Sequence, residues 1–356
     1  MERDRVVIVG GGLLGCAVAL EIARLQGARG GGAEVVVLER AIVGAEASSA
    51  AAGILAPRLE AHGREPLRSI GVESLTLYPA WVASLGADVG YARVGLLKVV
   101  RPGDSPASPD VDARWLDAAA ARAMEPGLAP DILGAWSLPE EATVDPRKLL
   151  PAVHAAAAAA GATFRVGEEV TATDAAGVTL ASGERVEGRV VVCAGAWTAK
   201  VPGLRALPVR PVRGQLVALS GAPIRHVLFG AGGYLVPRMD GRVIAGATVE
   251  DVGFSRGVTA GGVRAVLTTA TAMVPGLASA SFDGAWSGFR PGTPDELPAI
   301  GAVDGVWVAS GHYRNGILLA PLTARWLAAA IVDGAALPAV FSPGRFEERG
   351  GAASVG

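Results

Sequence analysis

Three glycines near the start of the chain have the spacing of a phosphate-binding turn. Gly10, Gly12 and Gly15 form a GxGxxG pattern directly after the β-branched run at residues 6–9. The first glycine of such a pattern permits a sharp turn, the second leaves room for a pyrophosphate, and the third lets a helix pack closely on its strand. The phosphate then lies at the helix N-terminus, where free N–H groups stabilise negative charge. Alone, the pattern is a weak signal, because 49 of the 356 residues are glycine.

An acid at the end of a second predicted strand strengthens this interpretation. Glu39 follows Gly15 by 24 residues (39 − 15), where a carboxylate can accept hydrogen bonds from an adenosine ribose. The alternative is an ordinary solvated charge at the end of a strand. Apolar residues at helical spacing predict a helix over residues 13–26, between the two strands. The chain therefore begins with a βαβ dinucleotide-binding unit, and NAD, NADP and FAD all remain open as cofactors.

The elements that follow must position this unit. Residues 43–57 are mostly small, which allows close approach of a ligand to the backbone, and Ser48 and Ser49 are expected to cap the following helix, with its N–H groups facing a phosphate. A flexible connector is the alternative. Periodicity and flanking turn residues predict further helices over residues 66–85, 113–124, 146–160 and 258–273.

Apolar and β-branched runs divide the rest of the chain. An apolar strand at 189–193 and the glycine that follows it are expected to bring Ala194, Gly195 and Trp197 back to the nucleotide. Residues 208–284 are rich in predicted strands, and Asp240-Gly241 is a hairpin signal. An antiparallel sheet, covered by the helix at 258–273, is therefore expected there. Residues 86–138 lack clear periodicity, so a second domain is expected to begin in them.

Composition and charge restrict the class of protein. About half of the residues (51%) are hydrophobic, so 356 residues can form a large core and two domains. The 32 basic residues nearly balance 34 acidic ones, which argues against nucleic acid as a partner. The first residues lack the apolar core of a signal peptide and no run is long enough to span a membrane, so a soluble cytoplasmic protein is expected. Cys16 and Cys193 are expected as buried core residues, without a disulfide or a metal.

Short motifs occur in one order from end to end of the chain. They are residues 10–15, 50–53, 194–197, 211–215, 234–238, 246–248, 288–295 and 311–321. Together they resemble the D-amino-acid oxidase superfamily of flavoenzymes, and within it the glycine oxidases associated with thiamin biosynthesis. The resemblance implies an α/β fold in which a Rossmann-like FAD-binding domain of the GR2 type is interleaved with an α+β substrate domain built on an antiparallel sheet. The implied segments are 1–85, 139–207 and 285–345 for FAD, 86–138 and 208–284 for substrate, and a frayed tail at 346–356.

The same resemblance implies a noncovalent FAD, because no cysteine is near residues 290–293, where related sarcosine oxidases attach their flavin. Residues 315–318 are expected to begin a helix whose free N–H groups face the flavin C2 carbonyl. The residues implied to contact FAD are Gly10, Gly12, Leu13, Leu14, Gly15, Glu39, Arg40, Ser48, Ser49, Ala51, Ala52, Gly53, Val170, Ala194, Gly195, Trp197, Arg290, His312, Arg314, Asn315, Gly316, Ile317 and Leu318. His312 has the alternative of a purely structural hydrogen bond.

Three side chains are implied to hold the substrate. Arg290 is expected to bind its carboxylate through a bidentate guanidinium fork, and Tyr234 to donate its hydroxyl to the same group. Arg314 is expected to help close the pocket. Their alternatives are a surface ion pair for Arg290, a core position for Tyr234, and a bridge to backbone carbonyls for Arg314.

The implied reaction is oxidative deamination of a small amino acid. Glycine is the leading substrate, with sarcosine or small D-amino acids in addition, and departures from the family pattern at Gly232 and Val249 leave the preference open. The imine hydrolyses to a keto acid and ammonia, and O2 is reduced to H2O2. No side chain is required as a general base. The rivals are a D-amino-acid dehydrogenase that uses a quinone, an RNA-modifying flavoprotein and a noncatalytic flavin-binding partner. Assembly into a homo-oligomer is left open.

Overall fold

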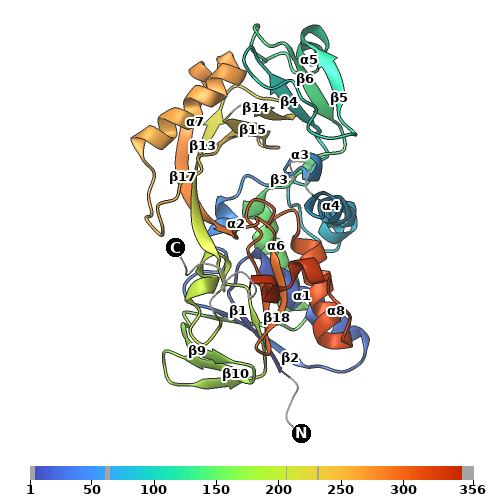
Figure 1. Ribbon diagram of the computed structural model, residues 1–356, viewed down its shortest axis with the longest axis vertical. Helices are drawn as coiled ribbons and strands as arrows, with labels where there is room; N and C mark the ends of the chain where they lie inside the picture. The colour runs from blue at the N-terminus through green and yellow to red at the C-terminus, as the bar shows by residue number, and fades with distance from the viewer. Residues whose placement is uncertain (1–4, 61–64, 206, 231, 347–356) are drawn as a thin grey trace, which may run out of the picture.

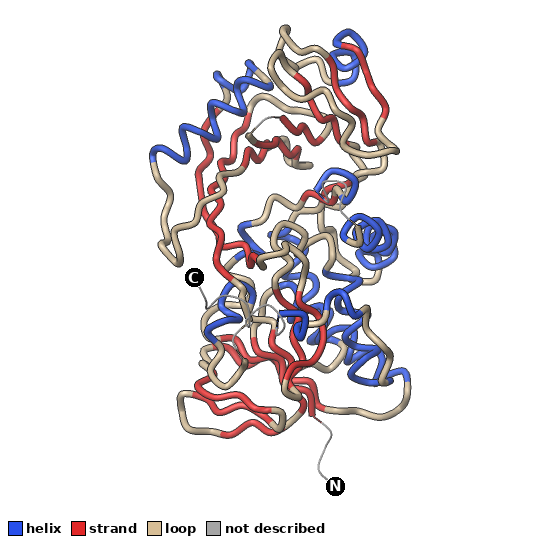
Figure 2. Tube along the Cα trace, in the orientation of Figure 1, coloured by secondary structure: helices blue, strands red, loops and turns tan. Residues whose placement is uncertain are grey.

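The structure is a computed structural model that describes residues 5–60, 65–205, 207–230 and 232–346. Two sheets lie at opposite ends of an elongated molecule, and the chain passes between them several times (Figure 1). Helices gather mainly around the six-stranded sheet, whereas the eight-stranded sheet carries one long helix, α7 (Ala260–Met273), on one face (Figure 2). The predicted α/β architecture is therefore confirmed.

The six-stranded sheet contains the predicted nucleotide-binding unit. Its order is β18-β19-β12-β1-β2-β8, and all neighbours are parallel except β18 and β19. The central strands are runs of valine because both of their faces are buried. The strands are β1 (Arg5–Val9), β2 (Glu34–Glu39), β8 (Thr163–Val166), β12 (Arg189–Val192), β18 (Ala299–Val303) and β19 (Val306–Ser310).

Three long helices cover one face of this sheet. Helix α1 (Leu13–Ala28) connects β1 to β2 and packs against α6 (Pro146–Ala159) and α8 (Ala320–Asp333). Cys16 and Cys193 lie in the shared core as free thiols, as predicted. Burial raises the pKa of Cys16 to about 12. Helix α4 (Leu67–Ala83) packs on α8 from outside, and its predicted apolar face is buried.

The eight-stranded sheet has the order β17-β13-β16-β15-β14-β4-β6-β5. Every neighbouring pair is antiparallel except β14 and β4, which are parallel. The Asp240-Gly241 turn joins β15 to β16, as predicted. The strands are β4 (Leu96–Val100), β5 (Arg114–Asp117), β6 (Gly134–Leu138), β13 (Arg210–Ser220), β14 (Val227–Gly230), β15 (Gly233–Pro237), β16 (Val243–Gly246) and β17 (Ser281–Gly292).

Smaller elements complete the fold. A three-stranded sheet of β9 (Val170–Asp174), β10 (Gly177–Leu180) and β11 (Arg185–Glu187) lies beside the six-stranded sheet, and β3 (Ile54–Leu55) pairs with β7 (Ala142–Thr143). The remaining helical elements are α2 (Ala47–Ala50), α3 (Pro57–Glu60), α5 (Ala118–Met124), η1 (Gly195–Lys200), η2 (Pro275–Ser279), η3 (Ala339–Phe341) and η4 (Pro343–Phe346).

The predicted helix over residues 113–124 is wrong in its first part. Residues 114–117 form strand β5, because Trp115 pairs with Trp136 of β6 and their rings pack at 5.2 Å between centroids. Asp117 then caps α5, and its side chain accepts the N–H of Ala120 at 2.8 Å. Side-chain packing between neighbouring strands thus overrides the local helical preference of the segment.

The predicted substrate domain ends at residue 284, but strand β17 runs from 281 to 292, so the eight-stranded sheet continues past that boundary. The division into domains stays a prediction. Of the predicted tail at 346–356, only Phe346 belongs to the described residues. Residues 1–4 of the predicted N-terminal segment lie outside the described residues as well.

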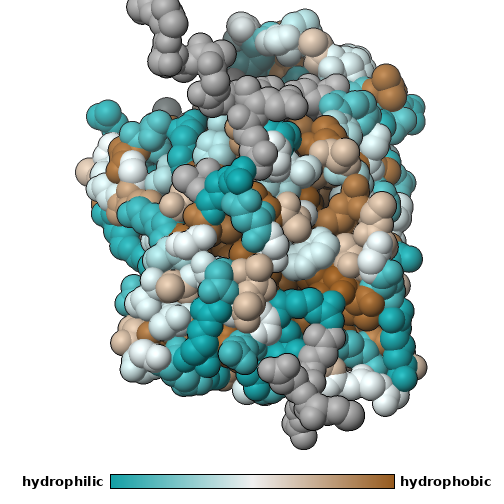
Figure 3. Space-filling view, turned by 60° about the horizontal axis from the view of Figure 1, so that its bottom comes forward, coloured by the Kyte–Doolittle hydropathy of each residue, from teal (hydrophilic) through white to brown (hydrophobic). Residues whose placement is uncertain are grey.

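The described surface mixes polar and apolar residues. Teal and brown areas alternate on the face shown in Figure 3. The three most exposed large apolar side chains, Val111, Met239 and Ile42, come from separate loops. Within the described residues, no helix is both long and apolar enough to cross a membrane.

Candidate active site

A cavity of about 480 Å³ opens where the carboxyl ends of β1, β2 and β12 meet strands β13, β15 and β17 of the larger sheet. Ligands of open α/β sheets bind at such carboxyl ends. The larger sheet closes the cavity from the opposite side with residues such as Gly214, Tyr234 and Arg290. Its size falls in the range of small-molecule and cofactor pockets.

The glycine turn has the predicted geometry. Gly10 has a φ of +108°, and a Cβ there would lie 2.6 Å from the carbonyl oxygen of Cys193. At Gly15 a Cβ would lie only 2.0 Å from the carbonyl oxygen of Gly10. Gly12 occupies the N-cap of α1, and a Cβ on it would point toward the Ser48 hydroxyl at 3.3 Å. The first and third glycines are therefore required for the turn and for the close packing of α1.

Two oxygen-bearing side chains fix this turn. The Glu39 carboxylate accepts the N–H of Gly11 at 2.9 Å through Oε2 and the N–H of Ala41 at 3.0 Å through Oε1. The Ser48 hydroxyl accepts the N–H of Leu13 at 2.9 Å. Glu39 is thus more than a solvated charge at a strand end, because it orients the start of the turn while it lines the cavity.

The predicted capping by the two serines is wrong. Ser48 and Ser49 lie inside the short helix α2, whose N-cap is Glu46, without a side-chain capping bond. Ser49 instead donates its hydroxyl to the carbonyl oxygen of Gly44. The reason is tertiary: α2 folds back toward the N-terminus of α1, so the Ser48 oxygen serves α1 rather than its own helix.

Most residues predicted to contact a cofactor lie around this one cavity. The lining includes Gly10, Gly12, Leu13, Leu14, Glu39, Arg40, Ser48, Ala51, Ala52, Gly53, Val170, Ala194, Gly195, Trp197, Arg290, His312, Arg314, Gly316 and Ile317. Tyr234 lines it as well. Four predicted residues are not among its lining residues: Gly15, Ser49, Asn315 and Leu318.

The predicted helix start at residues 315–318 is wrong, since α8 begins at Ala320. Residues 315–319 form a turn in which Leu319 donates its N–H to the carbonyl oxygen of Asn315 at 2.8 Å. Helix α4 holds the other side of this turn. Tyr78 donates its hydroxyl to the carbonyl oxygen of Ile317, and Ser74 donates to that of Leu318 at 2.6 Å. These buried contacts anchor the turn against α4 while Gly316 and Ile317 face the cavity.

His312 lines the cavity and also makes the structural contact that was the alternative for it. Its Nε2 lies 3.0 Å from the Thr323 hydroxyl, while its buried Nδ1 has no partner among the described residues. Burial lowers the pKa of His312 to about 3, so the ring is neutral at physiological pH. The side chain both lines the cavity and makes a structural contact.

Arg290 and Tyr234 approach the cavity from neighbouring parts of one sheet. Arg290 on β17 donates from Nη1 to the carbonyl oxygen of Thr248 at 3.1 Å. Its guanidinium fills the space beside Gly214, where a Cβ would lie 2.4 Å from Nη1. Burial raises the pKa of the Tyr234 hydroxyl, and the charge of Arg290 opposes that rise. The two groups therefore form one polar surface able to face an anion.

Sequence reasoning missed an acid in this polar surface. Glu60, the last residue of α3, lines the cavity, and its Oε2 lies 3.9 Å from Nη1 of Arg314. Burial raises the pKa of Glu60, although the charges of Arg314 and Arg290 oppose the rise. No sequence signal could have found it, because Glu60 is brought to Arg290 only by the packing of two distant segments.

The opposite end of the cavity is aromatic and cationic. The Arg40 guanidinium lies 4.6 Å from the centre of a Trp197 ring, and Arg256 lies 5.7 Å from the same ring. Arg256 also forms an ion pair with Glu46 at 2.5 Å. Sequence reasoning missed Glu46, Arg256 and Phe289, which lie at this end.

Comparison with known proteins assigns this arrangement to a family. The sequence pattern of the FAD dependent oxidoreductases matches residues 5–330. The chain belongs to this family. Within it, a glycine oxidase of Geobacillus kaustophilus is 36% identical over 90% of the chain and 91% of the relative. A bifunctional ThiO/ThiG protein of Synechocystis sp. is 38% identical over 96% of the chain and 54% of the relative.

Solved structures of this family share the whole fold. The crystal structure of Geobacillus kaustophilus glycine oxidase superposes with a TM-score of 0.86 at 33% identity, covering 96% of this chain and 98% of that one. An iminodiacetate oxidase from Chelativorans sp. superposes with a TM-score of 0.84 at 28% identity, covering 95% and 99%. The chain spans about half the length of the bifunctional relatives it matches.

The cavity fits the FAD of its family. A Cβ on Gly195 would meet no atom within 4 Å, and one on Gly316 would meet only His312 Cβ at 3.7 Å, so both glycines leave open space for a ligand. The unpartnered Nδ1 of His312 offers a polar contact there. Burial raises the pKa of Cys193, which also lines the cavity, so its thiol stays protonated at physiological pH.

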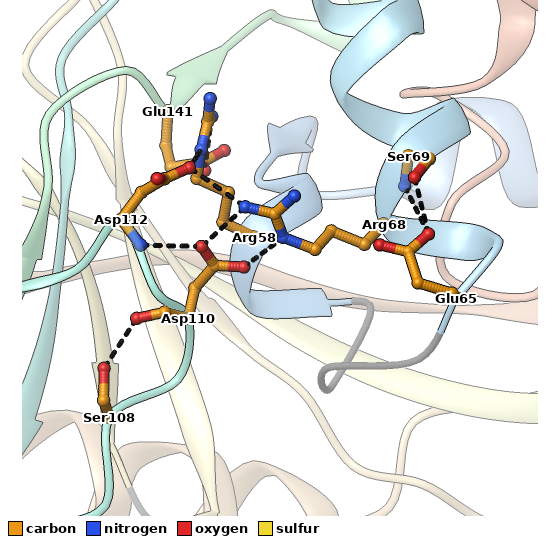
Figure 4. Close-up of polar contacts among 8 residues, drawn as sticks. All are labelled: Arg58, Glu65, Arg68, Ser69, Ser108, Asp110, Asp112 and Glu141. Atoms are coloured by element: carbon orange, nitrogen blue, oxygen red, sulfur yellow. Dashed lines mark hydrogen bonds and ion pairs between the residues drawn. The ribbon is translucent and has the colours of Figure 1, made fainter.

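An ion-pair cluster outside the cavity holds α3 in place (Figure 4). Arg58 on α3 donates to Asp112 at 3.0 Å and to Glu141 at 3.3 Å. Arg68 on α4 donates to both oxygens of Asp110, at 2.5 and 2.8 Å, and to Asp112 at 2.9 Å. The cluster therefore joins α3 and α4 to the loop that precedes β5 in the larger sheet.

Glu141 makes this cluster sensitive to pH. Burial raises the pKa of the Glu141 carboxyl from 4.5 to about 7, although Arg58 opposes the rise. The folded pKa exceeds the unfolded one, so the stability that Glu141 contributes is fully present below about pH 4.5 and is lost as pH rises through about 7. A shift of this size corresponds to about 3 kcal/mol.

The variant Glu141→Gln, which is neutral at every pH, should lose this dependence. As the pH rises from about 4.5 to above about 7, the unfolding free energy of the parent protein is expected to fall by about 3 kcal/mol relative to that of the variant. Urea unfolding across this range measures the difference. Glu140→Gln, at an exposed neighbour, is the control and should run parallel to the parent. A Glu141→Gln curve parallel to the parent would contradict the assignment.

Proposed function

We propose that this protein is an FAD-dependent oxidase that deaminates glycine, with sarcosine and small D-amino acids as further substrates. The observation that carries the proposal is the meeting of Arg290 and Tyr234 with the turn at 312–317 in one cavity. The similar proteins of Geobacillus kaustophilus and Pseudomonas putida are named glycine oxidases, and their similarity extends over about nine-tenths of this chain. The six-stranded sheet would belong to the FAD-binding domain and the eight-stranded sheet to the substrate domain.

The chain's own residues would bind and orient the substrate. The planar fork of Arg290 can pair with both oxygens of a carboxylate, and Tyr234 can donate its hydroxyl to one of them. Because Arg290 is already held by the Thr248 carbonyl, little side-chain freedom is lost on binding. Arg314 adds positive charge on the far side of the same anion. When bound, FAD supplies the acceptor for the Cα hydride and passes the electrons to O2.

Positioning would account for most of the rate. A carboxylate fixed at two points places the Cα–H bond in one orientation, which converts a bimolecular reaction into an effectively unimolecular one. The product imine then hydrolyses in water to glyoxylate and ammonia when glycine is the substrate.

The test begins with the purified protein under anaerobic conditions. We expect a yellow protein whose flavin absorbance is bleached by glycine but not by acetate, which keeps the carboxylate and lacks the amine. Under air, hydrogen peroxide should accumulate in proportion to glyoxylate. Bleaching without peroxide would show a dehydrogenase that needs another acceptor, such as a quinone. A colourless protein that binds NADH would overturn the whole proposal.

A further inference from the structure

Within the described part of the chain, Glu60 is a buried acid that lacks a hydrogen bond at Oε2 and lies in the part of the cavity lined by Arg290 and Arg314. Its side chain is 10% exposed, and its Oε2 is buried with no hydrogen-bond partner among the described residues. The titratable and charged groups that face it are Arg314, Arg290 and Tyr234. Buried polar atoms are nearly always satisfied, so an exception beside a ligand cavity indicates a ligand contact.

The contact between Glu60 and Arg314 is a long one for a buried ion pair. Their closest atoms are 3.9 Å apart. Two other largely buried pairs make short hydrogen bonds, 2.5 Å from Arg213 Nε to Glu250 and 2.9 Å from Arg345 Nε to Asp295. Arg238 and Asp145 are 4.0 Å apart, but there the carboxylate also accepts the N–H of Arg147 at 3.0 Å. Among the described residues, Glu60 Oε2 has neither a short bond to arginine nor another donor. Glu60 is instead held back from the cations that it faces.

The backbone of Glu60 is fixed independently of these cations. Arg58, two residues earlier in α3, forms ion pairs with Asp112 and Glu141 (Figure 4), and neither of these acids lines the cavity. This anchor keeps the Glu60 carboxylate at the cavity without any bond to Arg314. Its free oxygen is therefore available to a donor that enters with the substrate.

We propose that Glu60 accepts a proton from the ammonium group of the substrate, and so selects α-amino acids over other small carboxylates. This inference rests on the proposed function. Arg290 would bind the carboxylate end of a zwitterion and Glu60 the ammonium end. An amino acid presents both charges, whereas acetate or glycolate presents only one.

The proton transfer prepares the substrate for oxidation. An ammonium N–H bond breaks and an O–H bond forms on Glu60, which leaves a neutral amine. The nitrogen lone pair then forms the C=N bond as the Cα hydrogen leaves with its electron pair, and FAD is the acceptor. The substrate departs as an iminium ion, and Glu60 returns its proton to water. This adds a proton acceptor to a reaction for which the sequence indicated none.

The test compares Glu60→Gln with the parent holoenzyme in two measurements. The first is the rate of flavin bleaching by glycine without oxygen, followed across pH. The second is the affinity for glycine and for glycolate at neutral pH, read by rapid mixing from the perturbation of the flavin spectrum before bleaching. We expect the bleaching rate at neutral pH to fall about 100-fold, and the rate to rise only as pH approaches the pKa of the free amine. Affinity for glycine should fall, whereas affinity for glycolate should stay or increase.

A counter-ion role predicts a different pattern. If Glu60 only neutralises Arg314 and Arg290, its removal should strengthen binding of glycine and glycolate by the same factor and leave the pH profile unchanged, which would overturn the proposal. The exposed acid Glu65, which accepts hydrogen bonds from Ser69 outside the cavity, provides the matched control Glu65→Gln and should behave as the parent. Glu60→Asp keeps a carboxylate and should retain both bound FAD and the parent pH profile. It serves as the second test if Glu60→Gln folds poorly.

Failure of the proposed function is visible separately. If glycine does not bleach the flavin of the parent protein, oxidation of glycine is excluded, but the affinity ratio of glycine to glycolate still tests Glu60. A ratio unchanged by Glu60→Gln would overturn the inference even if the parent protein oxidises glycine rapidly.

Discussion

Arg290→Ala is expected to lower kcat/KM for glycine by about 100- to 1,000-fold while FAD remains bound. Two charge-assisted hydrogen bonds to a carboxylate contribute roughly 1.5–3 kcal/mol each, and a loss of about 3–4 kcal/mol corresponds to that factor. The side chain comes from β17 and donates a hydrogen bond to the Thr248 carbonyl oxygen. Its removal therefore leaves the glycine turn and the six-stranded sheet intact. Steady-state peroxide production and the flavin spectrum measure the two parts of the prediction.

A second variant moves the same guanidinium without removing its charge. A Cβ on Gly214 would lie 2.4 to 2.6 Å from the end of the Arg290 side chain, which must then shift. Gly214→Ala should thus raise KM for glycine while the flavin spectrum stays normal. Arg210→Ala is the control, since Arg210 lies on the same strand as Gly214 and pairs with Asp251 at the surface. Equal activity of Arg290→Ala and the parent would remove Arg290 from the site.

The parts of the fold that sequence predicted are those specified by local chemistry. The βαβ unit follows from a β-branched run, three spaced glycines and an amphipathic helix. Gly15 is required by a contact five residues away, with the Gly10 carbonyl oxygen, although Gly10 also meets the distant Cys193. The hairpin at Asp240-Gly241 is equally local. Arg290 and Tyr234 carry no such signal, and only the resemblance of whole motifs indicated them.

The features that sequence reasoning missed depend on contacts between distant segments. Helix α8 begins at Ala320 rather than at residue 315 because Tyr78 and Ser74 of α4 hold the preceding turn. Strand β5 replaces the start of a predicted helix because Trp115 packs on a neighbouring strand. Glu60 reaches the cavity through α3, a single helical turn with no periodicity to detect. In each case long-range packing decides between local conformations of similar energy.

Gly15→Ala is expected to destabilise the protein and to weaken FAD binding. The added Cβ would lie 2.0 Å from the Gly10 carbonyl oxygen and 3.5 Å from Cys193 Cβ. The carbonyl cannot yield, because Gly10 donates its N–H to Leu38 at 2.8 Å and has no space beside Cys193. Helix α1 must therefore move away from β1. Overpacking of this kind costs about 1–3 kcal/mol, and the upper value applies to a clash with backbone. The better helix propensity of alanine returns about 1 kcal/mol.

The unfolding free energy should therefore fall by about 2 kcal/mol. Movement of α1 also displaces the Leu13 N–H, which donates to the Ser48 hydroxyl in the parent protein. The N-terminus of α1 would no longer face the pyrophosphate correctly, so the Kd for FAD should rise about 30-fold. Gly27→Ala provides the matched control in the same helix, because a Cβ there meets nothing within 4 Å. It should stabilise the protein by up to about 1 kcal/mol and leave FAD affinity unchanged. Urea unfolding of the apoprotein and fluorescence titration with FAD distinguish the two variants. Equal Kd values for FAD in both variants would show that close packing of α1 on β1 does not position the helix for the cofactor.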